Sequence, residues 1–263
     1  MTEYQVGTLL RDWRQRRRMS QLELALEAEV SARHLSFVET GRSRPSREMV
    51  LRLAERLGIP PREQNALLVA AGFAPVFPER SLDSPELAAA RSAVDLILKG
   101  HEPVPALAVD RRWDLVAANR AVEPFMAGAD PALLTPPINV VRLSLHPDGL
   151  APRIRNLARW RNHMIQRLER DIEITGAAEL LDLLEEVRGY PVEERVRTEG
   201  SRLQAIPDGV AIPFEIAVGD AVLAFWSTTT VFGTPVDITL SELAIESFFP
   251  ANEETARALG ITR

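Results

Sequence analysis

The sequence contains no cysteine and no long run of uncharged apolar residues. The absence of cysteine excludes disulfides, cysteine-ligated zinc fingers, iron–sulfur clusters and thiol nucleophiles. No stretch approaches the roughly 18 apolar residues that a membrane span needs, and the first residues lack the basic and apolar regions of a signal peptide. We therefore expect a cytoplasmic protein that does not enter a membrane.

Familiar catalytic signatures are also missing. The chain has no G-x-S-x-G elbow, no P-loop and no G-x-G-x-x-G turn. Its four histidines, His34, His101, His146 and His163, are scattered without the spacing of a metal site. These observations predict that the protein is not an enzyme and holds no metal. An enzyme fused to another module would instead turn over any compound that it bound.

The distribution of charge divides the chain. Residues 1–75 hold 12 arginines and nine acidic residues, a net charge of +3, whereas the remainder carries 19 basic and 28 acidic residues, a net charge of −9. A basic segment in an acidic protein indicates that one module binds a polyanion and that the other has a different function. At 263 residues, we expect a domain over 1–75, a linker with a connecting helix over 76–100, and a second domain over 101–263.

The N-terminal domain shows the start and stop signals of five short helices. Ser20 and Glu23 form a capping box, in which each side chain bonds to the backbone of the other residue. Ser31 and Ser46 are expected to cap two further helices, and Gly41 is suited to the left-handed conformation that ends the third helix. The pattern predicts an all-α domain with two short helices joined by a tight turn.

The segment S-Q-L-E-L-A-L-E-A-E-V-S-A-R-H-L-S-F-V-E-T-G-R-S-R-P-S resembles the Xre/Cro-type helix-turn-helix, and the likeness covers about residues 5–72. It departs from the family at Glu29, where glycine is usual in the turn. The resemblance implies that the domain binds a double-stranded DNA operator. It also implies an internal ion pair between Arg14 and Glu39.

By position, the resemblance nominates one helix for the major groove. The residues proposed to contact DNA are Gln21, Ser31, Ala32, Arg33, His34, Ser36, Phe37, Arg42 and Arg44. Arg33 is suited to bidentate recognition of guanine, or else it contacts phosphate only. Gln21, Arg42 and Arg44 are expected to hold phosphates. His34 is either a contact or a spacer.

Beyond Gly72 the pattern changes. A connecting helix is expected from Ser84 to about Lys99, followed by a hairpin over 106–117 and a helix over 119–126. Long helices are expected over 150–174 and 177–187, then strands over 210–218, 221–232 and 243–249. The sum is an antiparallel sheet that carries helices, an α+β domain.

Three segments of this domain carry a second resemblance: A-L-A-V-D-R-R-W-D-L-V-A-A-N-R-A, N-V-V-R-L-S-L-H-P-D-G-L and F-G-T-P-V-D-I-T-L-S-E-L-A-I-E-S-F-F-P-A-N-E-E-T. They resemble the MmyB-like ligand-binding domain of bacterial regulators, over about residues 103–260. The family implies a PAS-like architecture, in which a sheet and its covering helices enclose a mainly apolar cavity. It also implies a small hydrophobic, fatty-acid-like ligand, with no other cofactor.

The residues proposed to line the cavity are large side chains on the expected helices and strands: Trp160, Met164, Leu168, Phe214, Phe225, Trp226 and Phe249. The alternative is that they form an ordinary core. Asn139, Arg142 and His146 match the family segment N-x-x-R-x-x-x-H-P and are candidates for a polar ligand head. Arg142 would clamp an anion, or it would tie down a loop.

Two functions follow from these patterns. In the first, the protein is a one-component transcription regulator, a homodimer, in which ligand binding biases operator affinity. In the second, the C-terminal domain is only a dimerisation or protein-interaction module with a fully packed interior.

Overall fold

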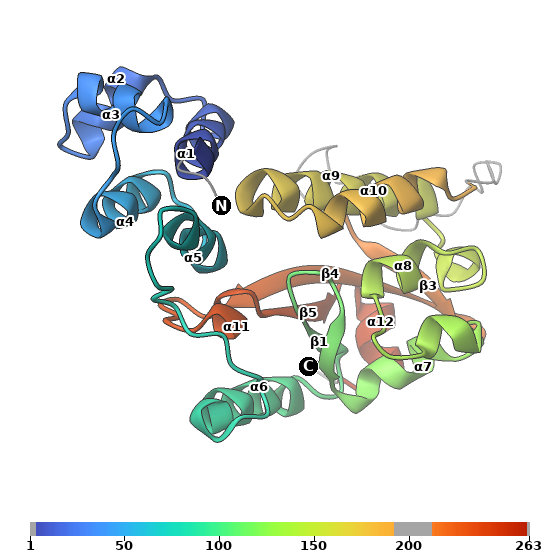
Figure 1. Ribbon diagram of the computed structural model, residues 1–263. Coiled ribbons are helices and arrows are strands. Elements are labelled where there is room, and N and C mark those ends of the chain that lie inside the picture. The colour runs from blue at the N-terminus through green and yellow to red at the C-terminus, as the bar shows by residue number, and fades with distance from the viewer. Residues whose placement is uncertain (1–3, 192–211, 262–263) are drawn as a thin grey trace. The chain divides into compact units, whose positions relative to one another are not determined.

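The computed structural model describes residues 4–191 and 212–261, and the chain forms two compact units (Figure 1). The first unit comprises Met1–Arg80 with the short segments Glu173–Gly176 and Thr234–Ser241. The second comprises Ser81–Ile172, Ala177–Gly233 and Glu242–Arg263.

The first unit contains the five expected helices. They are α1 (Tyr4–Arg16), α2 (Gln21–Glu27), α3 (Ala32–Glu39), α4 (Arg47–Arg56) and α5 (Pro61–Ala70). Each of α1 to α5 contributes at least one leucine of zero or near-zero exposure to a common core: Leu10, Leu24, Leu35, Leu53 and Leu67. The prediction of a five-helix domain is confirmed.

Serine caps start three of these helices as the sequence predicts. The hydroxyls of Ser20, Ser31 and Ser46 accept hydrogen bonds from the backbone N–H three residues further on, at 3.1, 3.1 and 3.2 Å. Glu23 completes the capping box, since its Oε2 accepts from the Ser20 backbone N–H at 2.6 Å. These caps satisfy N–H groups that a helix start otherwise leaves without partners.

Two of the residues with a left-handed backbone in the first unit flank the third helix. Gly41 has φ 71° after α3, as expected, and Glu29 has φ 54° in the turn between α2 and α3. For a residue with a Cβ atom this conformation costs about 1–2 kcal/mol. Glu29 therefore adopts a strained conformation, which glycine, the usual residue at this position of the turn, adopts without strain.

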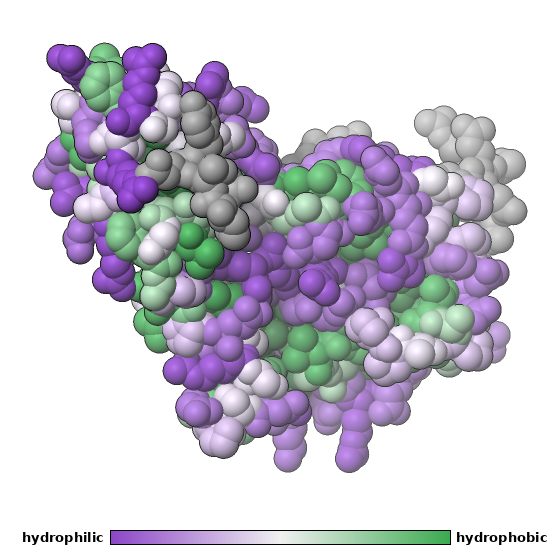
Figure 2. All heavy atoms as spheres, in the orientation of Figure 1, coloured by the Kyte–Doolittle hydropathy of each residue, from purple (hydrophilic) through white to green (hydrophobic). Residues whose placement is uncertain are grey.

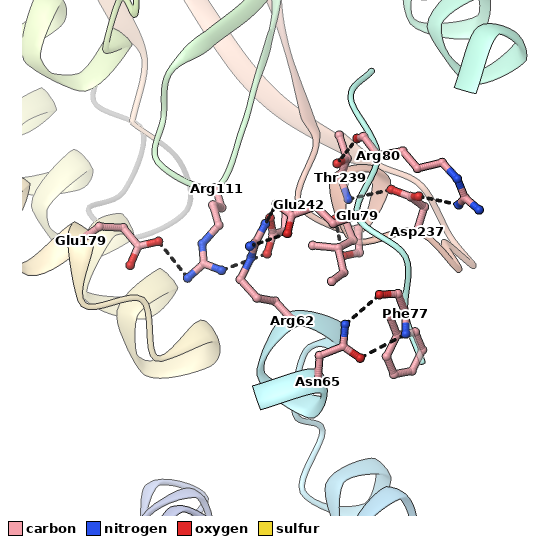
Figure 3. Close-up of polar contacts among 12 residues, drawn as sticks. Arg62, Asn65, Phe77, Glu79, Arg80, Arg111, Glu179, Asp237, Thr239 and Glu242 are labelled. Carbon is pink, nitrogen blue, oxygen red and sulfur yellow. Dashed lines mark hydrogen bonds and ion pairs between the residues drawn. The ribbon is translucent and has the colours of Figure 1, made fainter. Parts of the chain in front are cut away.

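The end of the first unit is tied by polar contacts (Figure 3). The Asn65 side chain on α5 accepts from the backbone N–H of Val76 at 2.9 Å and donates to the Phe77 carbonyl at 2.7 Å. In the segment grouped with this unit, Asp237 Oδ2 accepts from Arg80 Nη1 at 2.9 Å. The stretch after α5 therefore has a defined path.

The second unit is an α+β fold, as expected. Its helices, other than short 3₁₀ turns, are α6 (Ala88–Gly100), α7 (Glu123–Met126), α8 (Val140–Leu145), α9 (Leu157–Thr175), α10 (Glu179–Gly189) and α12 (Glu253–Ala258). The strands are β1 (Ala106–Val109), β2 (Leu115–Ala118), β3 (Phe214–Val218), β4 (Ala221–Val231) and β5 (Ala244–Pro250). The first two residues of the strand expected over 210–218 lie outside the described part. The short α11 (Ile238–Ser241) falls in the segment grouped with the first unit.

The long helix expected from Leu150 begins later, at Leu157. Residues 151–153 form a 3₁₀ turn, and Ile154 pairs as an isolated bridge with Ile216 of β3. The backbone N–H of Arg155 also donates to the Glu215 carbonyl, at 2.8 Å. These contacts with a strand about 60 residues away hold residues 154–155 out of a helix, and apolar periodicity does not reveal them.

The strands form one antiparallel sheet in the order β2-β1-β5-β4-β3. The PAS-like architecture, a sheet with covering helices, is confirmed. Helix α9 covers one face, where Trp160 packs on Phe214 with ring centroids 4.8 Å apart. At the end of the same sheet, Thr255 of α12 accepts a hydrogen bond from the Ala224 N–H of β4 at 2.9 Å. The main core of the unit lies between the sheet and α8, α9 and α10 (Figure 1).

Arg111, in the turn of the β1–β2 hairpin, ties three parts of the second unit together (Figure 3). Its guanidinium pairs with Glu179 at the start of α10 at 2.9 Å and with Glu242 just before β5 at 3.0 Å. The hairpin turn is thereby held beside α10 and β5.

Among the described residues, no helix is long and apolar enough to cross a membrane. On the face drawn in Figure 2, hydrophilic residues separate the apolar patches from one another.

Candidate DNA-contact helix and internal cavity

Except for Gln21 at the start of α2 and Ser31, the cap of α3, the positions nominated for DNA contact lie on α3 and in the segment after it. Arg33, Arg42 and Arg44 are exposed, while Ala32, His34, Ser36 and Phe37 are half-buried. The Arg33 guanidinium carbon lies 5.4 Å from the centre of the Phe37 ring, one turn further along α3. An exposed guanidinium supported by a ring is suited to contact a base edge or a phosphate.

Ser31 and Gln21 have partners within the protein. The Ser31 hydroxyl caps α3 by accepting from the His34 N–H. Gln21 Nε2 donates to Glu39 Oε2 at 2.7 Å. Both residues thus hold α2 and α3 in place, and this role does not depend on DNA.

The ion pair expected between Arg14 and Glu39 is confirmed. Arg14 Nε and Nη2 donate to the two oxygens of Glu39 at 2.7 and 2.8 Å, and Arg14 Nη1 donates to the Met19 carbonyl at 2.8 Å. Both side chains are buried, and the hydrogen bond with Glu39 raises the pKa of Arg14 above its ordinary value. The pair fastens α1 to α3 from inside.

The second unit contains a partly open cavity of about 100 Å³ between the sheet and its helices. This space is several times the roughly 10–15 Å³ that one water molecule requires. Most of the wall is apolar, and the described polar residues that line it are Ser144, Arg167, Ser227 and Glu246. The cavity therefore has the character of a binding site for a small apolar molecule.

Four of the side chains proposed from the sequence meet in the wall of this cavity: Trp160, Met164, Phe214 and Phe225. Leu168 is fully buried in the adjoining core. Trp226 and Phe249 pair with each other across β4 and β5, next to Phe225 and Phe248, which do line the cavity. Since neighbouring strand residues point to opposite faces, Trp226 and Phe249 lie on the other face of the sheet, and Phe249 is 46% exposed.

The three candidates for a polar ligand head lie elsewhere. Asn139 caps α8 by accepting from the Arg142 N–H at 3.0 Å, and it donates to the Arg112 carbonyl at 2.7 Å. Arg142 makes a bidentate pair with Glu186 of α10, both contacts 2.7 Å long. His146 Nδ1 accepts from the Asp148 N–H at 3.0 Å. The contacts of Asn139 and Arg142 hold α8 against the β1–β2 turn and α10.

The polar end of the cavity is formed by Arg167 of α9 and Glu246 of β5. Arg167 Nη1 and Nη2 donate to the Glu246 carboxylate at 2.9 and 2.5 Å, and Nη2 also donates to Thr229 Oγ1 at 2.7 Å. Sequence reasoning missed both residues. The sequence did point to Arg167, because it lies seven residues after Trp160 and three after Met164. In a helix, this spacing places all three side chains on the same face.

Trp113 of the β1–β2 turn lines the cavity beside this pair. Its ring lies 4.4 Å from the Arg167 guanidinium carbon, and its Nε1 donates to Asp171 Oδ2 at 3.1 Å. The backbone of Trp113 is left-handed, with φ 65°. Backbone hydrogen bonds hold it there, since Trp113 N–H donates to Asp110 and Val140 N–H donates to Trp113. A rare conformation thus presents the ring to the arginine.

Burial shifts the titration of two groups beside this end. The pKa of Asp171 is raised, chiefly because burial disfavours its charged form. The pKa of His163 is lowered, first by burial and then by the positive charges of Arg167 and Arg170. Among residues 4–191 and 212–261, no group of three or more histidine, aspartate or glutamate side chains is arranged to hold a metal ion.

A helical unit with an exposed arginine on its third helix, joined to an α+β unit with an internal cavity, defines a class of DNA-binding regulators with a ligand-binding domain. Comparison with known proteins agrees. Residues 90–260 match the MmyB-like transcription regulator ligand binding domain, and residues 10–64 match a helix-turn-helix family. The first match covers most of the sequence, and the chain belongs to the MmyB-like transcription regulator ligand binding domain family. Both matched families are those of transcription regulators rather than of enzymes.

Solved structures of the clp gene regulator ClgR from Corynebacterium glutamicum are also similar to part of the chain. One is 28% identical over 27% of this chain and 87% of its own, with a TM-score of 0.24. Another is 26% identical over 38% of this chain and 94% of its own, also with a TM-score of 0.24. No curated protein sequence matches the chain.

Proposed function

We propose that the protein is a one-component transcription regulator whose affinity for a DNA operator is set by a small hydrophobic molecule in the cavity of the second unit. The observation that carries this proposal is the cavity itself, with its mostly apolar wall and a few polar groups. The family of the domain supports the same function.

The DNA-reading part of the proposal rests on α3. Arg33 lies in its first turn, exposed, where a recognition helix meets base edges. Arg42 and Arg44 follow in an exposed segment and are suited to phosphate contacts. We propose that Arg33 reads sequence and that Arg42 and Arg44 set the register on double-stranded DNA.

Regulation requires that the ligand favour one of two states. A ligand shifts DNA binding only by its difference in affinity for the two states, typically worth about 1–3 kcal/mol. Emptying and filling the cavity should therefore change operator affinity by about 5- to 150-fold.

We propose further that the protein acts as a homodimer. One helix-turn-helix covers only a half-site, and half-sites lie about 34 Å apart on DNA. In α6, Leu96 is 70% and Ile97 is 41% exposed, an apolar surface available to a second subunit. The same exposure favours the alternative, in which the second unit is a dimerisation or protein-interaction module without a ligand.

Native mass spectrometry of the full-length protein, followed by extraction, tests the proposal. We expect a dimer that carries a releasable apolar molecule, and removal or return of that molecule should change the affinity for an operator selected from random DNA. An empty protein whose DNA binding responds to no apolar compound would contradict the proposal and favour the interaction module.

A matched pair of variants sharpens this test. Ser227→Phe places a ring in the cavity, and Thr228→Phe places the same ring on the exposed opposite face of β4. We expect the first variant to lose the bound molecule and its effect on DNA binding, and the second to keep both. Equal retention by the two variants would show that the molecule binds outside the cavity.

A further inference from the structure

The charged groups in the cavity wall neutralise each other. Arg167 is the one cation and Glu246 the one anion among the described residues that line the cavity. Their side chains are 17% and 5% exposed, and they pair through two hydrogen bonds. The polar end of the cavity therefore offers no net positive charge from its wall.

Arg167 has no free edge for a second carboxylate. A guanidinium clamps a carboxylate with two parallel N–H groups. The edge formed by Nη1 and Nη2 is taken by Glu246, and the other hydrogen of Nη2 points to Thr229 Oγ1. The Trp113 ring covers one face of the group. A ligand can reach a single remaining N–H at most from each of Nε and Nη1.

The groups behind the wall do not add positive charge either. Asp171 is bonded to the Trp113 indole, and it lies in the field of Arg167, Arg170 and Glu246. Arg167 and Arg170 thus lie beside two carboxyl groups, those of Asp171 and Glu246, while burial raises the pKa of Asp171 and favours the neutral form of His163. A carboxylate that entered would lose its water and meet the like charge of Glu246.

Two hydroxyl groups complete the polar lining. Ser144 Oγ accepts from Trp160 Nε1 at 2.9 Å, and its own hydrogen is suited to donate. Ser227 makes no side-chain hydrogen bond with any residue in the described ranges, although it lines the cavity. Neutral donors and acceptors of this kind match one uncharged polar group on an apolar molecule.

We propose that the cavity selects an uncharged apolar molecule with one hydrogen-bonding group, such as an amide, alcohol or ester, over the fatty-acid anion of the same chain length. The inference rests on the proposed function, because it names the ligand class of the same cavity.

Three probes with one alkyl chain test the inference: octanamide, 1-octanol and octanoate. Full-length protein freed of bound molecules is titrated with each by calorimetry at about pH 7.5, where octanoate is ionised. We expect the amide and the alcohol to bind at least about tenfold more tightly than octanoate. Octanoate binding should strengthen as the pH falls and the acid becomes neutral, while octanamide binding should change little.

Variants locate the cause of the preference. Glu246→Gln removes the negative charge and keeps the shape, so it should raise octanoate affinity about tenfold and leave octanamide affinity nearly unchanged. Glu186→Gln makes the same change in the Arg142–Glu186 pair, which lies away from the lining, and should alter neither affinity. Far-ultraviolet circular dichroism confirms that each variant is folded.

The outcomes separate two claims. If octanoate binds as tightly as octanamide at about pH 7.5, the inference on ligand class is overturned and the proposed ligand site stands. If Glu246→Gln folds and leaves the preference unchanged, the assigned cause is overturned. If none of the three probes binds, the inference on ligand class is overturned, and the extraction of the native protein decides separately whether the proposed ligand site stands.

Discussion

Each unit of the molecule contains a buried arginine–glutamate pair, and the two pairs differ in what surrounds them. Arg14 and Glu39 have side chains 10% and 1% exposed, close to the 17% and 5% of Arg167 and Glu246. The first pair is enclosed by further partners, Gln21 and the Met19 carbonyl. The second lines a cavity. Burial alone therefore does not distinguish a pair that holds helices together from one that lines a cavity, whereas the space beside it does.

The largest effect is expected from removing one acid of each pair. Glu39→Ala leaves Arg14 charged in a packed core, and a buried pair that loses one partner typically costs about 3–5 kcal/mol. Glu246→Ala should cost less, about 1–3 kcal/mol, because water can enter the cavity beside Arg167. Urea unfolding with peptide-resolved hydrogen exchange measures the loss in each unit. Equal losses would contradict the distinction between the two pairs.

A smaller effect is expected where a glycine lies against a carbonyl. A Cβ atom on Gly7 would lie 2.3 Å from the Val38 carbonyl oxygen, and one on Gly149 would lie 2.2 Å from that of Leu143. Gly7→Ala should destabilise the first unit, and Gly149→Ala the second, by about 1–3 kcal/mol each. Gly100→Ala is the control, because no atom lies within 4 Å of its added Cβ; it should stabilise α6 slightly. If either variant raises hydrogen exchange in both units, the two units do not unfold separately.

Substitutions of Arg33 and of Arg42 in the first unit are expected to affect DNA binding in different ways. Arg33→Ala should lose about 1–3 kcal/mol of preference for the operator over random DNA. Arg42→Ala should weaken binding to all sequences and lower the salt dependence by about one unit. Titrations of operator and random DNA at several salt concentrations measure both. Equal losses on the two DNAs for Arg33→Ala would contradict its role in reading bases.

A gain of stability is expected in the turn of the first unit. Glu29→Gly relieves the left-handed strain of about 1–2 kcal/mol but adds freedom to the unfolded chain. The net effect should be a stabilisation of up to about 1 kcal/mol. Glu27→Gly, at an exposed helical position of α2, should instead destabilise by about 0.5–1 kcal/mol. Thermal melts compare the two, and a loss of stability in both variants would contradict the strain.

The smallest effect concerns pH and the second unit. His163 has a folded pKa below its ordinary value of 6.5, so near and below that pH the unfolded chain binds more protons than the folded one. The stability of this unit should therefore fall as the pH is lowered through about 6.5, and His163→Gln should flatten that fall. Urea midpoints across this pH range provide the measurement. If His163→Gln leaves the pH dependence of stability unchanged, groups other than His163 cause the loss of stability at low pH.

Local features of the first unit were predictable because they depend on neighbours in the sequence. The caps at Ser20, Ser31 and Ser46 each join residues three apart. The left-handed backbone of Gly41 follows from the lack of a side chain. The pair of Arg14 and Glu39 is separated by 25 residues, and it was expected only because the sequence resembles a known family.

In the second unit, the sequence did not show which side chains of a strand face the cavity, because neighbouring residues point to opposite faces of the sheet. Phe225 and Trp226 are neighbours, as are Phe248 and Phe249, so only one of each pair can face the cavity. Sequence reasoning placed Phe225, Trp226 and Phe249 there and omitted Phe248. The register of β4 on β5 and the position of α9 decide which face is inside, and neither is encoded within a few residues.

The sequence by itself determined the two-part organisation, the helix-turn-helix with its caps, the α+β class of the second unit and the large apolar side chains available for a core. These properties depend on composition, periodicity and hydrogen bonds between near neighbours. Only the tertiary structure decided that α9 starts at Leu157, that Trp226 and Phe249 face away from the cavity, and that Arg167 meets Glu246 across 79 residues. The reason is physical: a side chain's partners across a sheet and a covering helix depend on strand register and packing, and these arise when distant segments fold together.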